Sequence, residues 1–267
     1  MGVPSLPLKD RVAVVTGAGG INGIGRAIAL KFADAGADVA VCDIVVKEKN
    51  WDLEGTAEEI RKLGRRSLAV QVDVTNESQV TAFFDKVVKE LGRIDILDNV
   101  VGAAAHSTLD GLTMELWEKG LNVNLKSAYV CSRAVSYIMK KQDKGVIINT
   151  SSLSGIDAGG ASVYGVAKQA VATLTRWLGW ELNPNHIRVN AIAPAGVYSD
   201  FGQHSIGGSF AEARRHTGTS RVTSEWGITR PNDIADVALF LASDASSRIN
   251  GQTILVDGGQ SLAMSWS

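Results

Sequence analysis

The chain has 267 residues, with 27 Lys and Arg against 28 Asp and Glu, and it is 45% apolar and 21% charged. This length can bury one large hydrophobic core, and the composition excludes a disordered chain and the basic footprint of a nucleic-acid-binding protein. Glycine is in excess, because 28 residues exceed the usual share of about 7%.

Short β-branched runs alternate with longer segments of helical periodicity. Strands are predicted at 12–15, 38–42, 67–72, 94–97, 145–149, 187–192 and 253–256. Helices are predicted at 25–35, 56–63, 77–91, 121–141, 163–182 and 231–241. Seven apolar strands separated by helices predict a doubly wound parallel sheet with helices on both faces, a Rossmann fold, as one domain over 1–267.

The location and the partners are also predicted from composition. No run reaches the roughly 18 apolar residues of a membrane span, and the N-terminus lacks the pattern of a secretory signal. Cys42 and Cys131 both lie in apolar patterns, as buried thiols do in a reducing compartment. We therefore expect a cytoplasmic protein with no membrane or nucleic-acid partner. The irregular segment 195–227, rich in Gly, Ser and Thr, is predicted to be a substrate lid.

A glycine-rich loop follows the first strand. Thr16 leads into Gly17-Ala-Gly-Gly-Ile-Asn-Gly-Ile-Gly25 and then into a helix. Glycines let the backbone approach a pyrophosphate there, and the helix N-terminus offers free N–H groups. A nucleoside-triphosphate loop is disfavoured, because Arg26-Ala27 stand where Lys and Ser or Thr are required.

Asp43 ends the second strand, 26 residues after Gly17. An acidic side chain there can accept hydrogen bonds from the adenosine ribose hydroxyls and repels a 2′-phosphate. This favours NAD over NADP, although Lys47 and Lys49 lie close enough to weaken the argument.

Tyr164 and Lys168 are spaced by four at the start of a predicted helix, so they share one face. An ammonium near a phenol lowers its pKa from about 10, as a tyrosine acting as acid and base near neutral pH requires. Such pairs are also common on solvated helix faces. The hydroxyls that follow the fifth strand, in Asn149-Thr-Ser-Ser-Leu-Ser-Gly155, add to the signal, because doubly wound folds bind ligands at that sheet edge. Asn124 precedes a helical run and is open to interpretation as a helix cap.

At this point the sequence resembles the single-domain short-chain dehydrogenase/reductases, from Lys9 to Gly259. The matching residues are Thr16-Gly17, Gly23-Ile-Gly25, Asp73-Val74, Asn99, Gly102, Asn122-Val-Asn-Leu125, Ser151-Ser152, Tyr164, Lys168, Ile187-Arg-Val-Asn-Ala191, Pro194, Gly196-Val197, Gly251-Gln252 and Val256-Asp-Gly-Gly259.

The resemblance implies a role for each candidate residue. Tyr164 would exchange the substrate proton, Lys168 would lower its pKa and hold the nicotinamide ribose, Ser152 would orient the substrate oxygen, and Asn124 would anchor a proton-relaying water chain. The residues implied to bind the dinucleotide are Gly17, Asn22, Gly23, Ile24, Gly25, Asp43, Asp73, Val74, Asn99, Gly102, Tyr164, Lys168, Val197 and Ser199. The four histidines have no metal-ligand spacing, so no metal is expected. Relatives imply a homotetramer or another homo-oligomer.

Three departures from the family pattern stand out. Five residues separate Gly17 from Gly23 where three are usual, and Val100 replaces a sheet-bracing asparagine. The longer spacer resembles the enoyl-reductase branch, whose Tyr-to-Lys gap is longer than the one here. Alignment on Gly155 selects Ser152 as the catalytic serine, whereas a count of 13 residues back from Tyr164 selects Ser151.

These observations predict an NAD-dependent oxidoreductase that moves a hydride between NAD and a secondary alcohol or ketone, with a sugar, a polyol or a cyclic alcohol as the small-molecule substrate. One alternative is an NADPH-dependent ketoreductase of the 3-oxoacyl type, which Asp43 argues against. The other is a non-catalytic dinucleotide-sensing protein, which the complete Tyr, Lys, Ser and Asn set argues against.

Overall fold

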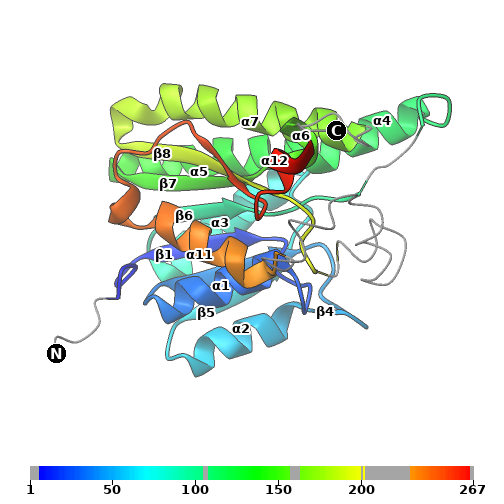
Figure 1. The fold of residues 1–267 in the computed structure, drawn as a ribbon. Helices are drawn as coiled ribbons and strands as arrows, with labels where there is room; N and C mark the ends of the chain where they lie inside the picture. The colour runs from blue at the N-terminus through cyan, green and yellow to red at the C-terminus, as the bar shows by residue number, and fades with distance from the viewer. Residues whose placement is uncertain (1–5, 105–107, 157–162, 200, 202–228, 265–267) are drawn as a thin grey trace.

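The structure is a computed structural model that describes residues 6–104, 108–156, 163–199, 201 and 229–264. Its centre is a seven-stranded parallel sheet in the order β5-β2-β1-β6-β7-β8-β9 (Figure 1). The strands are β1 Val12–Thr16, β2 Asp38–Asp43, β5 Ser67–Gln71, β6 Ile96–Asn99, β7 Gly145–Thr150, β8 Ile187–Pro194 and β9 Thr253–Val256. After β5 the chain crosses to the other side of β1, so the order reverses between β1 and β6. Doubly wound folds bind ligands at such a switch point.

Helices cover both faces of the sheet. The longer ones are α1 Ile24–Asp34, α2 Leu53–Lys62, α3 Glu77–Leu91, α4 Met114–Leu121, α5 Ser127–Gln142, α7 Val163–Leu182 and α11 Pro231–Ala242, and the short ones are α6 Leu153–Ile156 and α12 Gln260–Met264. A two-stranded hairpin, β3 Lys47–Glu48 with β4 Trp51–Asp52, lies between β2 and α2.

The ends of the helices follow from local chemistry. Asp52 caps α2, because its carboxylate accepts the N–H of Gly55 at 2.9 Å, and Asn76 and Thr113 cap α3 and α4 in the same way. Gly92, with a φ of 96°, ends α3 in the left-handed conformation that glycine adopts without a steric cost.

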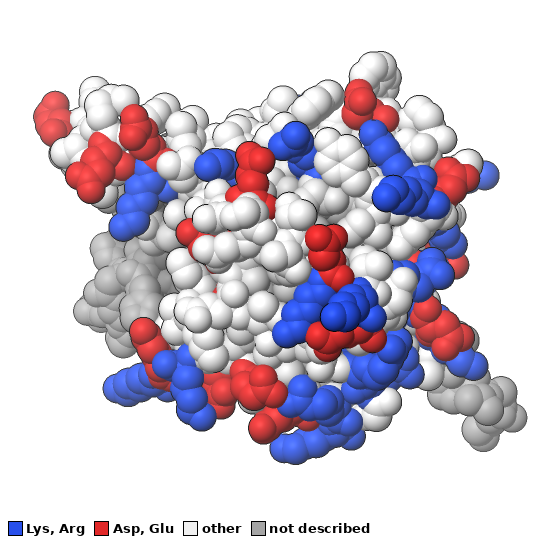
Figure 2. All heavy atoms as spheres, turned by 180° about the vertical axis from the view of Figure 1, so that it is seen from behind, with Lys and Arg blue, Asp and Glu red and all other residues white. Residues whose placement is uncertain are grey.

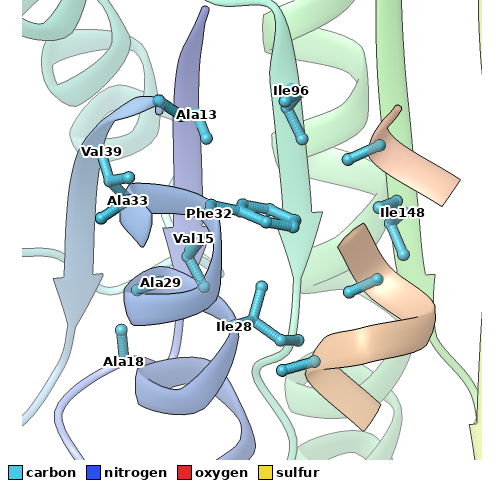
Figure 3. Close-up of a cluster of buried hydrophobic side chains, with 14 of the residues drawn as sticks. Ala13, Val15, Ala18, Ile28, Ala29, Phe32, Ala33, Val39, Ile96 and Ile148 are labelled. Carbon is cyan, nitrogen blue, oxygen red and sulfur yellow. The ribbon is translucent and has the colours of Figure 1, made fainter. Parts of the chain in front are cut away.

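Two apolar layers hold the sheet. On one face, α1 and α11 pack against β1, β2, β6 and β7 (Figure 3). Phe32 fills the middle of this layer and is fully buried, with Ile28 one turn before it. On the other face, α3, α5 and α7 cover the sheet around Phe84 and Met139. The strands are therefore buried on both sides, as their continuous apolar runs predict.

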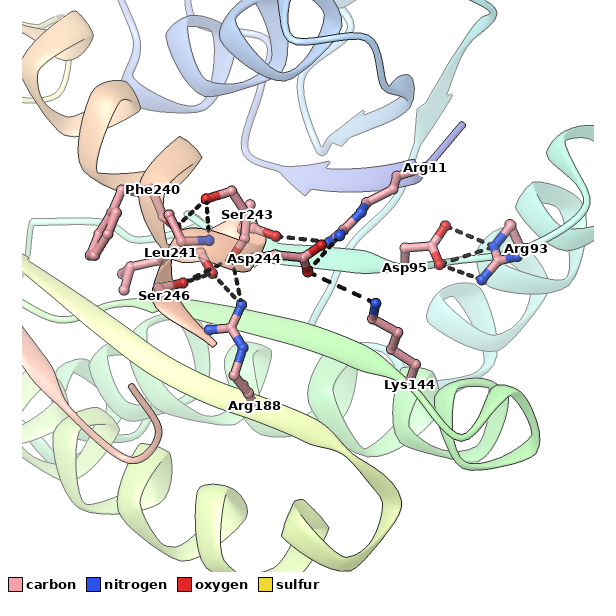
Figure 4. A network of polar contacts seen from close by, with 12 residues as sticks. Arg11, Arg93, Asp95, Lys144, Arg188, Phe240, Leu241, Ser243, Asp244 and Ser246 are labelled. Atoms are coloured by element: carbon pink, nitrogen blue, oxygen red, sulfur yellow. Dashed lines mark hydrogen bonds and ion pairs between the residues drawn. The ribbon is translucent and has the colours of Figure 1, made fainter. Parts of the chain in front are cut away.

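The amino edge of the sheet carries a polar network (Figure 4). Arg11 pairs with Asp244 at 2.7 Å and donates to the carbonyl of Ala242, and Arg188 donates to the carbonyls of Leu241 and Ser243. The Arg11 hydrogen bond lowers the pKa of Asp244. These cations meet the negative end of the α11 dipole and fix that helix to β1 and β8.

The surface drawn in Figure 2 carries interspersed acidic and basic side chains. Within the described ranges, no helix is both long enough and apolar enough to cross a membrane.

The structure confirms the predicted order of strands and helices and adds elements that periodicity did not reveal. The helix predicted at 121–141 corresponds to a π-helical turn over Asn122–Lys126 followed by α5, and α4, which precedes the turn, was not predicted. The strand predicted at 94–97 runs instead from Ile96 to Asn99, and the hairpin of β3 and β4 was not predicted. Nearly all of the predicted lid at 195–227 lies outside the described residues, and the lid and the domain extent of 1–267 stay predictions.

Asp98 is an exception within the apolar layer under α1. It lies on β6 between Val15 of β1 and Ile148 of β7 and is fully buried, and neither carboxylate oxygen has a hydrogen-bond partner among the described residues. Burial disfavours the charged form and raises the pKa of Asp98 well above its ordinary value.

This environment predicts a pH dependence of stability. The unfolded chain releases the Asp98 proton above about pH 4, whereas the folded chain retains it, so the free energy of unfolding falls as the pH rises above that value. We expect Asp98→Asn to flatten this slope between pH 5 and pH 9 in urea unfolding. Asp85→Asn removes an exposed carboxyl of the same shape and is expected to leave the slope unchanged. Equal slopes in wild type and Asp98→Asn would contradict the assignment.

Candidate active site

The end of β7 and the start of α7 meet at the carboxyl edge of the sheet. Lys168 is 2% exposed, and its ammonium donates to the carbonyl oxygen of Thr150 at 2.8 Å. Ser151 donates its hydroxyl to the carbonyl of Lys168 at 2.8 Å. Gly155 lies so close to α7 that a Cβ there would stand 2.6 Å from the Gln169 nitrogen. This junction therefore fixes the start of α7.

The hydroxyl groups of Ser151 and Ser152 make different contacts. The Ser151 hydroxyl is buried and points at α7. The Ser152 hydroxyl hydrogen-bonds the phenol of Tyr164 and accepts the N–H of Ser154 at 3.2 Å. The geometry therefore places Ser152, and not Ser151, beside Tyr164.

The phenol and the ammonium are close neighbours. The Lys168 nitrogen lies 5.8 Å from the centroid of the half-buried Tyr164 ring. Burial lowers the pKa of Lys168 to about 8. Burial raises the pKa of Tyr164, and the Ser152 hydrogen bond lowers it by less.

Burial therefore dominates the pKa of Tyr164 in the chain alone, and a lowering of that pKa by Lys168 stays a prediction. The ammonium donates its hydrogen bond to Thr150 and not to the phenol, so desolvation of the phenolate dominates.

Asn124 is not a helix cap. It lies inside the π-helical turn and is 1% exposed. Its amide donates to the carbonyls of Ala103 and Gly120 at 3.0 Å each and accepts the N–H of Ala103 at 3.0 Å. It thereby holds the chain after β6 against α4 and brings Gly102 beside Lys168. A Cβ on Gly102 would lie 3.0 Å from the Asn124 oxygen and 3.3 Å from the Lys168 nitrogen.

Asn99 has a bracing role in the structure. Its side chain is buried and donates to Ser132 of α5 and Asn149 of β7, and Asn149 in turn donates to Thr175 of α7. This chain of bonds ties β6 and β7 to the helices, which is the bracing that Val100 cannot supply. The side-chain nitrogen of Asn99 already donates to Ser132 and Asn149. The predicted contact of Asn99 with the cofactor would therefore come from its main chain.

The glycine loop lies at the reversal of the strand order. A Cβ on Gly25 would stand 2.3 Å from the carbonyl oxygen of Gly17, and Gly23 begins α1 with no side-chain cap. The Thr16 hydroxyl accepts the N–H of Val100 and so joins the loop to the chain after β6. The narrow cradle and the uncapped helix end fit the phosphates of a dinucleotide. Asn22 is exposed and Ile24 is half-buried, both at the start of α1.

Asp43 lies beside this loop and is 8% exposed. Its two carboxylate oxygens accept the N–H groups of Gly19 at 2.9 Å and Val45 at 3.2 Å. Burial raises the pKa of Asp43, and these backbone hydrogen bonds oppose that shift.

The other predicted cofactor residues border the same edge. Asp73 accepts the N–H of Thr75 at 2.9 Å, and Val74 is buried. Val197 bridges to Thr229, and Ser199 is 2% exposed. Three of the four histidines, His106, His204 and His216, lie outside the described residues, as do Arg214, Arg215, Arg221 and Trp226 of the predicted lid.

Phe201 was not predicted as a site residue. Its ring lies 6.1 Å from the Tyr164 ring, with an angle of 36° between their planes. Because it follows β8 within an irregular sequence, no periodicity marked it.

Comparisons with known proteins identify the family of the chain. A family profile described as Enoyl-(Acyl carrier protein) reductase matches residues 17–261. The 3beta-hydroxysteroid dehydrogenase 2 of Eggerthella lenta is 35% identical over 260 residues, which are 95% of this chain and 96% of that protein. The 3-oxoacyl-acyl-carrier-protein reductase of Thermotoga maritima is 36% identical over 254 residues, which are 94% and 98%.

A solved structure of 7 alpha-hydroxysteroid dehydrogenase, complexed with NADH and 7-oxo glycochenodeoxycholic acid, superposes with a TM-score of 0.87 at 32% identity and covers 97% of this chain and 98% of that chain. The chain belongs to the short-chain dehydrogenase/reductase family. As a member it is an oxidoreductase that binds a nicotinamide dinucleotide.

The packing of Gly102 yields a test of this site. Asn124 and Lys168 are both held by hydrogen bonds and cannot yield to a methyl group, so we expect Gly102→Ala to lower the free energy of unfolding by about 1–3 kcal/mol. Gly196→Ala adds a methyl group with no atom of the described residues within 4 Å, and is expected to change the free energy of unfolding by less than about 0.5 kcal/mol. Urea unfolding of both variants measures the difference, and equal stabilities would contradict the tight packing.

Proposed function

We propose that this chain is an NAD-dependent dehydrogenase that interconverts a secondary alcohol and its ketone. The observation that carries the proposal is the convergence of Ser152, Tyr164 and Lys168 at the carboxyl edge of the sheet, next to the glycine loop. A dinucleotide held at this edge would supply the hydride acceptor for oxidation of the carbinol carbon and the hydride donor for reduction of the ketone.

Tyr164 is the proton-transfer group of this reaction. During oxidation the phenolate takes the hydroxyl proton of the alcohol, and during reduction the phenol gives a proton to the developing alkoxide. Ser152, hydrogen-bonded to the same phenol, donates to the substrate oxygen and stabilises its developing negative charge. Because burial raises the pKa of Tyr164, oxidation becomes faster as the pH rises.

Lys168 and Asn124 act behind Tyr164. The ammonium of Lys168, buried and tied to Thr150, favours the phenolate through space and holds the nicotinamide ribose. Asn124 fixes Gly102 and Ala103 beside Lys168, at the start of the proposed water chain that carries the proton to solvent.

The remaining predicted residues are proposed to bind the dinucleotide along the carboxyl edge. Gly17, Asn22, Gly23, Ile24 and Gly25 meet the pyrophosphate. Asp73, Val74, Asn99 and Gly102 meet the adenosine half, and Val197 and Ser199 meet the carboxamide. Asp43 accepts hydrogen bonds from the unphosphorylated ribose and repels a 2′-phosphate, so NAD is preferred to NADP.

The substrate is proposed to be a cyclic alcohol. Phe201 places an apolar ring face beside Tyr164, which favours a carbon ring over the hydroxyl-rich surface of a sugar or a polyol. The hydroxysteroid dehydrogenases among the relatives support this choice.

An NADPH-dependent ketoreductase is the second candidate, and the similarity to the Thermotoga maritima reductase favours it. Asp43 argues against it, because a carboxylate beside a 2′-phosphate is unfavourable. A non-catalytic dinucleotide sensor would not require Ser152, Tyr164 and Lys168 together.

Two helices, α5 and α7, carry exposed aromatic side chains. Tyr129 and Tyr137 on α5 and Trp177 and Trp180 on α7 are exposed, with Trp180 at 75%, and we propose that these helices pair subunits in a homotetramer or a dimer. Light scattering measures the mass of the assembly directly.

The two cysteines, Cys42 and Cys131, are buried and free, which supports a cytoplasmic location.

Turnover with NAD and a panel of cyclic alcohols, hydroxysteroids, sugars and polyols tests the chemistry. We expect Tyr164→Phe to lower kcat about 10²–10⁴-fold, and Ser152→Ala to lower it about 10²–10³-fold. Ser152→Ala should also shift the rising limb of the pH profile of oxidation to higher pH, because the Ser152 hydrogen bond lowers the Tyr164 pKa. Ser151→Ala removes a buried bond to α7 and should mainly lower stability, by about 1 kcal/mol. A loss of turnover in Ser151→Ala alone would reverse the serine assignment, and an unchanged Tyr164→Phe would revive the sensor.

The cofactor preference has its own test. We expect the wild type to have a higher kcat/KM with NAD than with NADP, and Asp43→Ala to lower the NAD value about 10–100-fold through the loss of charge-assisted hydrogen bonds. The NADP value should rise, since the repelling charge is gone. A wild type that turns over faster with NADP would favour the ketoreductase.

A further inference from the structure

The hairpin formed by residues 44–52 is bonded to the glycine loop. Within the hairpin, β3 and β4 pair antiparallel, and Trp51 forms a further antiparallel bridge with Gly20. The Asp52 N–H donates to the Gly19 carbonyl at 2.8 Å, and the Ile21 N–H donates to the Asn50 carbonyl at 2.9 Å. The loop therefore adds a short third strand to the hairpin.

The hairpin accounts for the unusual length of the loop. The loop holds five residues between Gly17 and Gly23, and the bonded residues, Gly19 to Ile21, lie within this stretch. The long loop and the hairpin after β2 are thus two halves of one local structure.

Trp51 and Asp43 converge on one point of this structure. A Cβ on Gly19 would lie 2.9 Å from Cδ1 of the Trp51 ring, 3.1 Å from an Asp43 carboxylate oxygen and 3.0 Å from the Val45 carbonyl. The same Gly19 gives its N–H to Asp43, and Val45, inside the hairpin, gives the second. Trp51 is half-buried.

We propose that Trp51 is a positioning residue that determines cofactor specificity, by holding the glycine loop and the Asp43 carboxylate in a single arrangement beside the adenosine ribose. This inference rests on the proposed function. A carboxylate held by two backbone N–H groups cannot turn away from an incoming 2′-phosphate, so its repulsion acts in full. The same fixed carboxylate meets the hydroxyls of an unphosphorylated ribose without a further ordering cost.

A purely structural brace predicts a different outcome. Such a brace would change stability, or the affinity for both dinucleotides equally. A specificity role instead changes the ratio of the two affinities, because only the fixed charge distinguishes NAD from NADP.

Calorimetric titration of the substrate-free protein with NAD and with NADP separates these outcomes. We expect Trp51→Ala to weaken NAD binding about 10-fold and to leave NADP binding equal or tighter, with kcat at saturating NAD unchanged. Trp51→Phe keeps an aromatic ring over Gly19 and should restore most of the ratio. Val46→Ala, an exposed neutral change in the same hairpin, should match the wild type.

Equal weakening of both dinucleotides in Trp51→Ala, or an unchanged ratio, would overturn the proposal. Where Trp51→Ala fails to fold, Trp51→Leu gives the same comparison, with folding checked by thermal unfolding. A wild type that binds NADP as tightly as NAD would instead contradict the proposed cofactor preference, so the two failures are distinguishable.

Discussion

The buried ammonium of Lys168 is the constraint on which the candidate active site depends. A cation out of water needs a hydrogen-bond acceptor, and the Thr150 carbonyl at the end of β7 is the acceptor that it contacts. That one bond sets the distance between the sheet edge and α7, and the Ser151 hydroxyl and the close approach of Gly155 set the rotation of the helix. Tyr164, one turn before Lys168, then faces Ser152. The proposed catalytic arrangement is a consequence of satisfying a buried charge.

Buried hydrogen bonds within the sheet connect to this junction. Asn99, Asn149 and Thr175 form a buried polar chain from β6 through β7 to α7. Each amide in it is oriented by its neighbour, so strand positions next to the site cannot slide independently of the helix. The opposite edge is held by Arg11, Arg188 and Asp244, far from the chemistry. The polar network that anchors α11 and the candidate active site therefore lie at opposite ends of the strands.

Much of the fold could be predicted from the sequence, because each strand is a continuous apolar run and most helices show an apolar face. The hairpin at 44–52 could not, since Lys47, Glu48 and Lys49 carry no apolar period and its partner is a glycine loop. The π-helical turn was also hidden, because one extra residue barely alters a helical pattern. Within the site, Tyr164 and Lys168 followed from their spacing, and Ser152 and Asn124 from a family resemblance. The choice between Ser151 and Ser152 needed the direction of each hydroxyl. The burial of Asp98 was not predicted, because the predicted strand ended at residue 97, whereas β6 runs to Asn99.

The π-helical turn at 122–126 has a consequence for how this chain can vary in length. The N–H of Ser127 reaches back to the carbonyl of Asn122, which makes room for one more residue per turn, and Asn124 bonds to the carbonyl of Gly120 inside the widened turn. Adding or removing a residue between Met114 and Asn124 would turn every upstream side chain by about 100° relative to Asn124. Natural insertions and deletions should therefore accumulate in the segment before Met114. The continuous helical segment from α4 to α5 should keep a fixed length among related proteins.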